Sequence, residues 1–297
     1  MLKISTIIPV YNALEDVKKC LDSLVKNYDF SNELIIIDDC SDTETQKFLQ
    51  VFVADTANVK LLINKENVGY LKSCNYAINH ATGDIIILLN SDTMIPPLFC
   101  EKIKKCFEHN PDIGVACPIL SNSGHKDFMI PLPWGKDINF MNNLLDRRHV
   151  PTYPQTLSCN GSCFCVRKKV FEKIGYFDEI YGKGYYEEVD FCYRAIKAGF
   201  LCVIIDNLYI HHKWHASFNS EERKRLSQKN QQIFLAKWKG FAEKWYKKSG
   251  CPHYIYKLQK KIFRHQPLLI QNSHERFKIF LFGIKIFSYK KAQNSDA

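Results

Sequence analysis

Carboxylate and amide side chains follow short apolar runs in the first hundred residues, and such groups can bind cations or phosphate-containing ligands. Asp38-Asp39 follows residues 34–37, Asn67-Val68-Gly69 follows residues 59–63, and Asn90-Ser91-Asp92 follows residues 85–89. Mg²⁺ often takes only one or two protein carboxylates and leaves its other positions to phosphates and water. Asp92 is therefore a candidate metal ligand, although aspartate also favours turns and helix N-termini.

Clusters of cysteine and histidine suggest a different kind of site. The cysteines are Cys159, Cys163 and Cys165, and the histidines are His211, His212 and His215. These residue types bind zinc, but the Cys-x-Cys spacing is tighter than the usual two to four intervening residues. The simpler interpretation of the 12 cysteines is a reduced cytosolic protein, in which free cysteine acts as a small hydrophobic residue.

The segments that must position these side chains alternate between strand and helix patterns. Apolar runs at 4–10, 34–37, 59–63 and 85–89 predict buried strands, and helical spacing predicts helices between them. Strands that are apolar on both faces indicate a parallel sheet covered by helices, which binds ligands beyond the carboxyl ends of its strands. The polar groups at the strand ends should therefore share one edge of an α/β fold.

The second half of the chain is less regular. Residues 121–154 are rich in Pro, Asn and Gly and predict a long irregular region. Helices are predicted at 168–174 and 187–198, a strand at 201–205, and a basic helical region from about residue 220 onward.

Several classes of protein are excluded or disfavoured. No Gly-x-Gly-x-x-Gly follows the first strand and no Gly-x₄-Gly-Lys-Ser/Thr occurs, which argues against a dinucleotide-dependent oxidoreductase and a P-loop enzyme. The longest apolar run, residues 85–89, is far shorter than the roughly 20 residues that span a bilayer. The amino terminus runs directly into a strand pattern, so we expect no signal peptide.

The charge of the chain is concentrated at its end. Residues 1–218 hold 23 Lys and Arg against 26 Asp and Glu, whereas residues 219–297 hold 18 against 5. A basic tail indicates an anionic partner: a membrane surface, a nucleic acid or an anionic substrate. In residues 276–291, Lys alternates with aromatic and aliphatic side chains, which favours docking at an anionic membrane surface. A β-hairpin with Gly283 at its centre is the alternative.

Four segments, in this order along the chain, carry a family resemblance. They are Thr-Ile-Ile-Pro-Val-Tyr-Asn at 6–12, Ile-Ile-Ile-Asp-Asp-Cys-Ser at 35–41, Leu-Leu-Asn-Ser-Asp at 88–92 and Tyr-Glu-Glu-Val-Asp-Phe-Cys-Tyr-Arg at 186–194. The sequence resembles family 2 glycosyltransferases of the GT-A fold, and within them the rhamnosyltransferase-like branch.

The resemblance implies an α/β fold of GT-A type, with a mainly parallel nucleotide-binding sheet flanked by helices. It implies a glycosyltransferase domain at 1–218, made of a nucleotide-sugar half at 1–118 and an acceptor half at 119–218. A basic helical and amphipathic C-terminal extension, residues 219–297, follows.

The resemblance also implies which residues bind the nucleotide-sugar donor. They are Pro9, Tyr11, Asp38, Asp39, Asn67, Gly69, Asn90 and Ser91. A carboxylate can accept the N3–H of uracil or thymine, so a UDP- or dTDP-sugar is favoured. For Asp38, a cap on the next helix is the alternative.

Asp92 and His212 are implied to bind a divalent metal, Mg²⁺ or Mn²⁺. Asn90 stands where the family's Asp-x-Asp element has its first aspartate.

By the same resemblance, the catalytic base stands at the second position of a Glu-Asp pair, which is Glu188 here. Glutamate is chemically competent, but its side chain is one methylene longer, so Glu187 remains an alternative base. The residues expected to bind the acceptor are Trp134, Gly161, Tyr186, Asp190 and Arg194. Asp190 and Arg194 are four residues apart, where a simple helical ion pair contributes about 0.2–0.5 kcal/mol.

These implications describe an inverting, metal-dependent hexosyltransferase. It would move a sugar from a nucleoside-diphosphate sugar to a hydroxyl of a lipid-linked acceptor or of a surface glycan such as lipopolysaccharide or capsule. We expect a cytoplasmic protein docked at the inner face of the cell membrane, with no nucleic-acid partner. The alternative is a catalytically decayed module that binds nucleotide-sugars or glycans. A nucleotidyltransferase is disfavoured because residues 9–15 contain no Lys or Arg.

Overall fold

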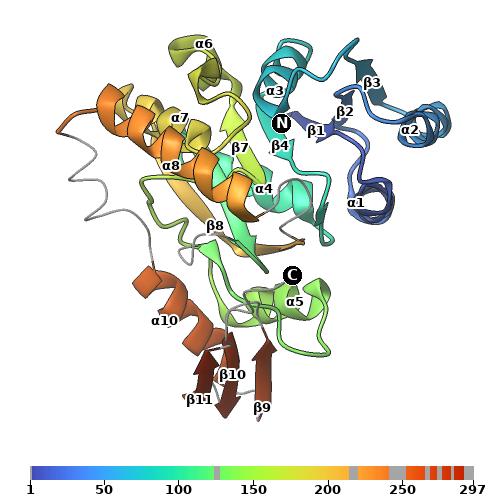
Figure 1. Ribbon diagram of the computed structural model, residues 1–297. Coiled ribbons are helices and arrows are strands. Elements are labelled where there is room, and N and C mark those ends of the chain that lie inside the picture. Colours follow the sequence, from blue (N-terminus) through green and yellow to red (C-terminus); the bar gives the residue numbers. More distant parts are fainter. Residues whose placement is uncertain are drawn as a thin grey trace.

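The computed structural model describes residues 2–123, 128–213, 220–240, 252–264, 268–272, 276–281 and 284–290 (Figure 1). The first part of the fold alternates strands and helices. Its elements are β1 (Ile4–Val10), α1 (Leu14–Asn27), β2 (Glu33–Asp38), α2 (Thr43–Asp55), β3 (Val59–Ile63), α3 (Tyr70–Ile78), β4 (Ile85–Leu89), β5 (Thr93–Met94), α4 (Phe99–His109) and β6 (Ile113–Leu120).

The second part contributes fewer strands and more helices. Its elements are α5 (Ile138–Arg148), β7 (Cys163–Arg167), α6 (Lys168–Ile174), the 3₁₀ turn η2 (Glu179–Tyr181), α7 (Glu187–Lys197), β8 (Leu201–His212), α8 (Ser220–Lys237), α10 (Pro252–Phe263), β9 (Leu268–Asn272), β10 (Arg276–Leu281) and β11 (Ile284–Lys290).

The main sheet is mixed and has the strand order β3-β2-β1-β4-β7-β6-β8-β5. Strands β1 to β4 run parallel. Strand β7 lies antiparallel between β4 and β6, and β8 runs parallel to β6 and antiparallel to β5. The predicted parallel α/β core is confirmed, and β7 and β5 add three antiparallel pairings, β7 with β4 and β6 and β5 with β8, that the strand patterns did not reveal.

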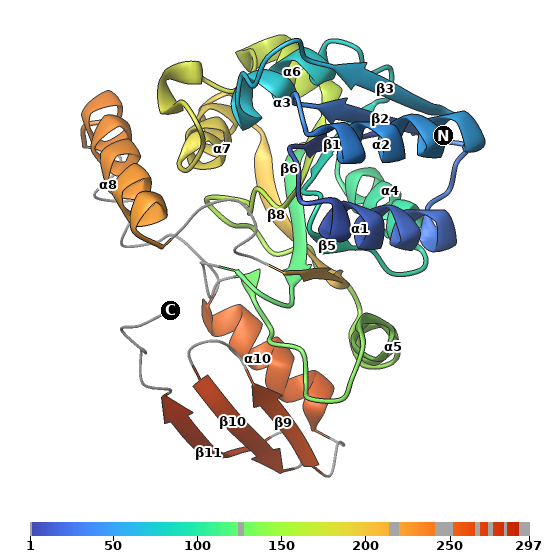
Figure 2. The ribbon, with the colours of Figure 1, turned by 45° about the vertical axis from the view of Figure 1, so that its right-hand side comes forward.

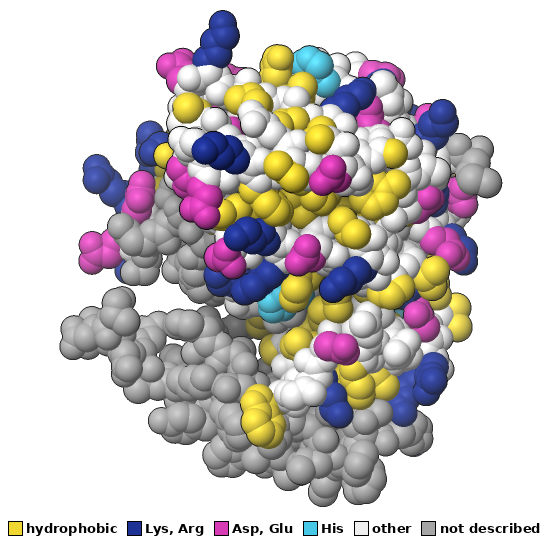
Figure 3. All heavy atoms as spheres, turned by 90° about the vertical axis from the view of Figure 1, so that its right-hand side faces the viewer, with side chains coloured by type: hydrophobic (Ala, Val, Ile, Leu, Met, Phe, Trp, Pro, Cys, Tyr) yellow, Lys and Arg dark blue, Asp and Glu magenta, His cyan; other side chains and the backbone are white. Residues whose placement is uncertain are grey.

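Side chains alternate between the two faces of this sheet, as strand geometry requires. On β2, Ile35 and Ile37 pack into one core cluster, and Leu34 and Ile36 pack into the other. Helices α1, α2 and α4 cover the second face, and α3, α6 and α7 cover the first (Figure 2). On the side of α1 and α2, acidic and basic side chains are interspersed, in keeping with the near-neutral charge of residues 1–218 (Figure 3).

The irregular region expected at 121–154 contains a helix. Asp137 caps helix α5 by accepting a hydrogen bond from the backbone N–H of Phe140 at 2.8 Å. Met141 and Leu145 of α5 are fully buried. The prediction of a wholly irregular segment was therefore wrong, because a capped helix with an apolar face lies within it.

The C-terminal part packs on the same core. Phe234 of α8 and Ile262 of α10 are completely buried and belong to the core cluster that includes α3 and α7. Strands β10 and β11 pair antiparallel, and β9 pairs with the other side of β10. The hairpin alternative for the tail is thus confirmed over the described strands. None of the described helices has the length and apolar character that a membrane span requires.

Candidate functional site

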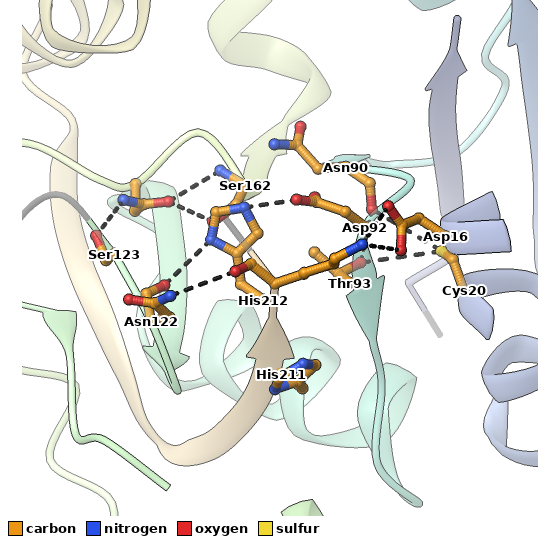
Figure 4. A network of polar contacts seen from close by, with 12 residues as sticks. Asp16, Cys20, Asn90, Asp92, Thr93, Asn122, Ser123, Ser162, His211 and His212 are labelled. Atoms are coloured by element: carbon orange, nitrogen blue, oxygen red, sulfur yellow. Dashed lines mark hydrogen bonds and ion pairs between the residues drawn. The ribbon is translucent and has the colours of Figure 1, made fainter. Parts of the chain in front are cut away.

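Strand pairing brings Asp92 and His212 together. β5 pairs with β8 so that Thr93 lies opposite His212, and this register places Asp92 beside the histidine ring. The Oδ1 atom of Asp92 lies 3.4 Å from Nε2 of His212. Both side chains point into the same small space near the end of β8 (Figure 4). The sequence prediction that these two residues act together is consistent with this geometry.

The backbone around His212 orients its ring. Nδ1 lies 3.1 Å from the carbonyl oxygen of Asn122, and the N–H of His212 donates to Oγ of Ser121 at 3.0 Å. Because a carbonyl oxygen only accepts hydrogen bonds, Nδ1 must carry the proton. The lone pair of Nε2 is then directed toward Asp92, which is the tautomer that a metal-binding histidine needs.

A divalent cation fits these groups. Oδ1 of Asn90 is buried without a hydrogen-bond partner, and so is available as a further oxygen ligand on the same strand end. Two adjacent ligands of an octahedral Mg²⁺ ion lie about 3 Å apart, close to the separation of Asp92 and His212. Within the described ranges, no cluster of three His, Cys, Asp or Glu residues could hold a metal. The donor set therefore suits a cation that takes its remaining ligands from phosphate and water.

A lysine lies directly beside this pair and was missed by the sequence analysis. The backbone N–H of Lys213 donates to the carbonyl of Asp92 at 3.1 Å. Its Nζ donates to both carboxylate oxygens of Asp16 on α1, at 2.7 and 2.9 Å (Figure 4). Nothing in the sequence around Asp16 indicates a site, because its partner is 197 residues away.

On the nucleoside side, Asp39 fixes the loop that leads into α3. Its carboxylate accepts hydrogen bonds from Nδ2 of Asn64 and from the backbone N–H groups of Val68 and Gly69, at 2.8–3.0 Å. The side chain is buried. Asp39 therefore brings Asn67 and Gly69 to the end of β2, as the sequence analysis expected for the donor site.

Asp38 is also buried, and it holds the following turn. Its carboxylate accepts from the backbone N–H of Ser41 at 3.1 Å and from Nε2 of Gln46 at 3.0 Å. The cap of α2 is Asp42, which accepts from the N–H of Thr45. The alternative in which Asp38 caps the helix is therefore wrong.

The remaining predicted donor residues lie along the same strand ends. Pro9 pairs with Ile37 within the sheet, while Tyr11, just beyond β1, keeps 55% of its surface exposed. Gly69 begins α3 with φ at +88°, a left-handed conformation that a side chain would strain. Ser91 is partly buried between Asn90 and Asp92.

The turn at residues 160–162 lies between the strand end that leads to Asp92 and the predicted base. The N–H of Asn90 donates to the carbonyl of Ser162 at 3.0 Å. On the other side of the turn, Cδ of Glu188 lies 3.8 Å from the point where a Cβ at Gly161 would sit. Asn160 anchors the turn by donating to Oγ of Ser123. The two halves of the predicted site therefore approach each other through Gly161.

The environments of Glu187 and Glu188 differ. Glu187 is buried, and burial together with the neighbouring charge of Glu188 raises its pKa well above the usual value of 4.5. Glu188 is only partly buried and lies against Gly161. Of the two candidates, the accessible Glu188 is the better placed to meet an acceptor hydroxyl. Burial raises the pKa of Tyr70 of α3, and both glutamates lie close enough to add to this rise; no sequence signal had indicated this residue.

The predicted acceptor residues are not all at one place. Tyr186 precedes α7, and its ring packs against Phe234 of α8 with the centroids 5.7 Å apart. Trp134 is 74% exposed in the segment before α5. Gly161 lies beside Glu188.

Asp190 and Arg194 form the ion pair that their spacing predicts, at 2.8 Å. Asp190 is fully buried, and its carboxylate also accepts from Tyr181, Lys237 and Trp238. The other guanidinium nitrogens of Arg194 donate to two backbone carbonyls. These contacts satisfy both side chains within the protein, so we do not propose Asp190 or Arg194 as acceptor ligands.

The cysteines do not form the alternative zinc site. Cys159 is buried in one core cluster, while Cys163 and Cys165 point to the other face of the sheet. His211 contacts Ser121 and turns away from Asp92 (Figure 4). His215 lies outside the described residues.

Comparison with known proteins decides the family. Residues 5–175, more than half of the chain, match Glycosyl transferase family 2. The chain belongs to this family. This confirms the family that the sequence resemblance indicated. The matched segment contains Asp38, Asp39 and Asp92, and it ends before Glu187 and His212.

Individual relatives agree with this assignment. An uncharacterized glycosyltransferase of Haemophilus influenzae is 32% identical over 111 residues, which are 37% of this chain and 36% of that protein. The first curated relatives are matched over 16% to 66% of their own length, so this chain corresponds to only part of each.

Solved structures of glycosyltransferases share the fold. The mannosyltransferase PcManGT from Pyrobaculum calidifontis, in complex with GDP-Man and Mn²⁺, matches with a TM-score of 0.57 and 16% identity over 75% of this chain and 60% of that one. Residues 1–349 of S. aureus TarS, in complex with UDP-GlcNAc, match with a TM-score of 0.54 and 19% identity over 75% and 63%. At these identities the likeness establishes the α/β fold of GT-A type.

Proposed function

We propose that the protein is an inverting, metal-dependent glycosyltransferase that moves a sugar from a nucleoside-diphosphate sugar to an acceptor hydroxyl. One observation carries the proposal: the turn at residues 160–162 contacts Asn90, two residues before Asp92 of the Asp92–His212 pair, on one side and Glu188 on the other. An inverting displacement needs these two groups on opposite sides of the reacting carbon, with the leaving diphosphate at one and the attacking hydroxyl at the other.

In this reaction Asp92, His212 and Asn90 hold a Mg²⁺ or Mn²⁺ ion. Bound there, the ion neutralises the charge that develops on the leaving diphosphate. The protein's part is to keep Nδ1 of His212 protonated, so that Nε2 stays available. Solved relatives of the same fold contain Mn²⁺, which supports this choice of ion.

Glu188 takes the proton of the acceptor hydroxyl. Glu187 is less suited to this role, because burial and the neighbouring charge of Glu188 raise its pKa and so disfavour its ionised form. A general base must be ionised before the reaction and accessible to the hydroxyl. The burial of Glu187 and the partial exposure of Glu188 favour Glu188 on both counts.

The donor is a nucleoside-diphosphate sugar, with UDP or dTDP favoured. Tyr11 would stack on the base at the exposed end of β1. Asp39 keeps acceptor capacity on Oδ2 for a pyrimidine N3–H, since the contacts described for that atom use one of its two lone pairs. The TarS structure with UDP-GlcNAc supports a uridine donor. The PcManGT structure with GDP-Man shows that a protein of the same fold binds a guanosine donor, which is the alternative.

The acceptor is a hydroxyl of a surface glycan or a lipid-linked sugar, contacted by Gly161, Tyr186 and Trp134. The charge of residues 219–297 supports a location at an anionic membrane surface on the cytoplasmic side. Lys285 of β11 is exposed, as such a surface would require.

The test is the release of nucleoside diphosphate by the purified protein. UDP-, dTDP- and GDP-sugars are incubated with a glycan acceptor mixture and Mn²⁺, then with EDTA, beside Asp92→Ala and Glu188→Gln. We expect metal-dependent release from one donor that falls strongly in both variants. Donor binding without release in any condition would overturn the enzyme proposal in favour of a decayed binding module.

A further inference from the structure

A single buried amide on α8 holds the loop that leads into the glutamate pair. Asn230 is 1% exposed, and its Nδ2 donates to the carbonyl oxygens of Tyr181, Gly184 and Tyr185 at 2.7, 2.7 and 3.0 Å. Tyr181 is the last residue of η2, and Gly184 and Tyr185 lie in the loop between η2 and α7. One side chain thus ties together the start and the end of the segment that precedes Glu187.

The backbone of this loop has an unusual conformation. Four of its five residues have positive φ: Gly182 at 64°, Gly184 at 124°, Tyr185 at 70° and Tyr186 at 76°. Two consecutive tyrosines in this region are strained, and such conformations persist only where the surrounding structure fixes them. No side chain caps α7 at Tyr186. Contacts from outside the loop, such as those of Asn230, help to fix this backbone.

Helix α8 and the residue after it supply further contacts on the C-terminal side of Asn230. Phe234, one turn later, packs against the ring of Tyr186. At the end of the helix, Lys237 donates to Asp178 at 2.6 Å and to Asp190 at 2.7 Å, and Nε1 of Trp238 donates to Asp190 at 2.7 Å. α8 therefore grips the segment before η2, the loop and the first turn of α7.

We propose that Asn230 is a positioning residue that sets the place of Glu188 by fixing the left-handed start of α7. The proposal rests on the proposed function, in which Glu188 is the base. Glu188 is the second residue of α7, so a change in the loop's backbone moves its carboxylate directly. A displacement of about 1 Å at a reacting group can lower a rate by about 10²-fold.

The binding of metal and nucleotide on the donor side should not depend on Asn230. Asp92 and His212 are placed by the pairing of β5 with β8 and by contacts with Ser121 and Asn122. Asn230 contacts none of these residues. Its loss should therefore lower the turnover number and leave the binding of metal and nucleotide unchanged.

The test is a double-mutant cycle between Asn230 and Glu188. Four proteins are compared: the native protein, Asn230→Ala, Glu188→Gln and the double variant. Gln228→Ala, on the exposed side of the same helix, is the matched amide-to-alanine control. For each protein, kcat of sugar transfer and the Kd of the nucleoside diphosphate with Mn²⁺ are measured. Asn230→Ser replaces Asn230→Ala if the alanine variant does not fold.

If Asn230 acts through Glu188, Asn230→Ala lowers kcat about 10²-fold in the native background and less than about 3-fold when Glu188 is already glutamine. The nucleotide Kd should stay within about 2-fold of that of Gln228→Ala. An equal loss of kcat in both backgrounds, or activity equal to Gln228→Ala, would overturn the inference. Full activity of Glu188→Gln would instead show that Glu188 is not the base. The experiment therefore distinguishes a failure of the proposed function from a failure of the role assigned to Asn230.

Discussion

The two sides of the proposed catalytic site are built in different ways. On the donor side, Asp92 and His212 meet because β5 pairs with β8, and the strands fix both residues by backbone register. On the base side, Glu187 and Glu188 follow a loop of left-handed residues that has no strand partner and is held by side chains of α8. The comparison suggests that the donor side is rigid by topology, whereas the base side depends on a few remote contacts.

The largest effect is expected from breaking the donor side at His212. His212→Ala should lower nucleoside diphosphate release about 10³-fold at fixed Mn²⁺, because ion stabilisation of a leaving group contributes several kcal/mol. His211→Ala is the matched control, since that ring turns away from Asp92 (Figure 4). Release measured across a range of Mn²⁺ concentrations checks this. A His212→Ala protein with the metal requirement of His211→Ala would contradict the assignment.

On the base side, removing a contact is expected to lower the stability of the protein. Asp190→Asn should lower the free energy of unfolding by about 3 kcal/mol, because it leaves the charges of Lys237 and Arg194 uncompensated beside a buried position. Asp178→Asn contacts the same lysine at a partly exposed site and should cost less than about 1 kcal/mol. Urea unfolding of both variants measures the difference. Equal losses of unfolding free energy in the two variants would show that Asp190 does not hold α8 more strongly than Asp178 does.

The sequence predicted the donor side better than the base side, for physical reasons. Strands buried on both faces produce continuous apolar runs, so the ends of β1, β2 and β4 and the polar residues there could be located. Asn230 could not be found this way. Its partners are backbone carbonyls, which leave no trace in residue types.

Helix α5 was missed for a related reason. Asparagine usually favours turns, yet Asn142 uses its amide to hold the backbone of Tyr209 on β8, accepting at 3.1 Å and donating at 2.8 Å. A residue that suggests a loop thus serves as a tertiary contact within a helix. The boundaries of β3, β4 and α6 were predicted correctly because their apolar patterns are strong.

The pH dependence of stability sharpens the contrast between the two glutamates. Because the folded pKa of Glu187 is raised above 4.5, its favourable contribution is present below that pH and is lost as pH rises toward the raised value. Glu187→Gln removes this loss, so its stability advantage should grow by up to about 1.4 kcal/mol per pH unit above pH 4.5. Thermal unfolding from pH 4 to 8 tests it. A difference that does not change with pH would mean that Glu187 titrates normally.

The smallest effect is expected where the two sides meet. In Gly161→Ala the new methyl group would lie 3.8 Å from Glu188, which is an ordinary contact. We expect a loss of only a few-fold in kcat with an unchanged nucleotide Kd, because the methyl group reduces the space for the acceptor and leaves the metal ligands in place. Steady-state kinetics with donor and acceptor varied separately check this. Weakened nucleotide binding would show that the turn belongs to the donor side.

The spacing of these contacts along the chain also sets the order in which a newly made protein can complete them. Lys213 and Asp16 are 197 residues apart, whereas Asn230 and Tyr181 are only 49 apart. At synthesis rates of about 5–20 residues per second, Asp16 waits roughly 10–40 s for its partner, and the loop before α7 waits roughly 2–10 s. The part of the site that emerges first from the ribosome therefore waits longest for its partner, and Asp92 can meet His212 only after β8 has emerged.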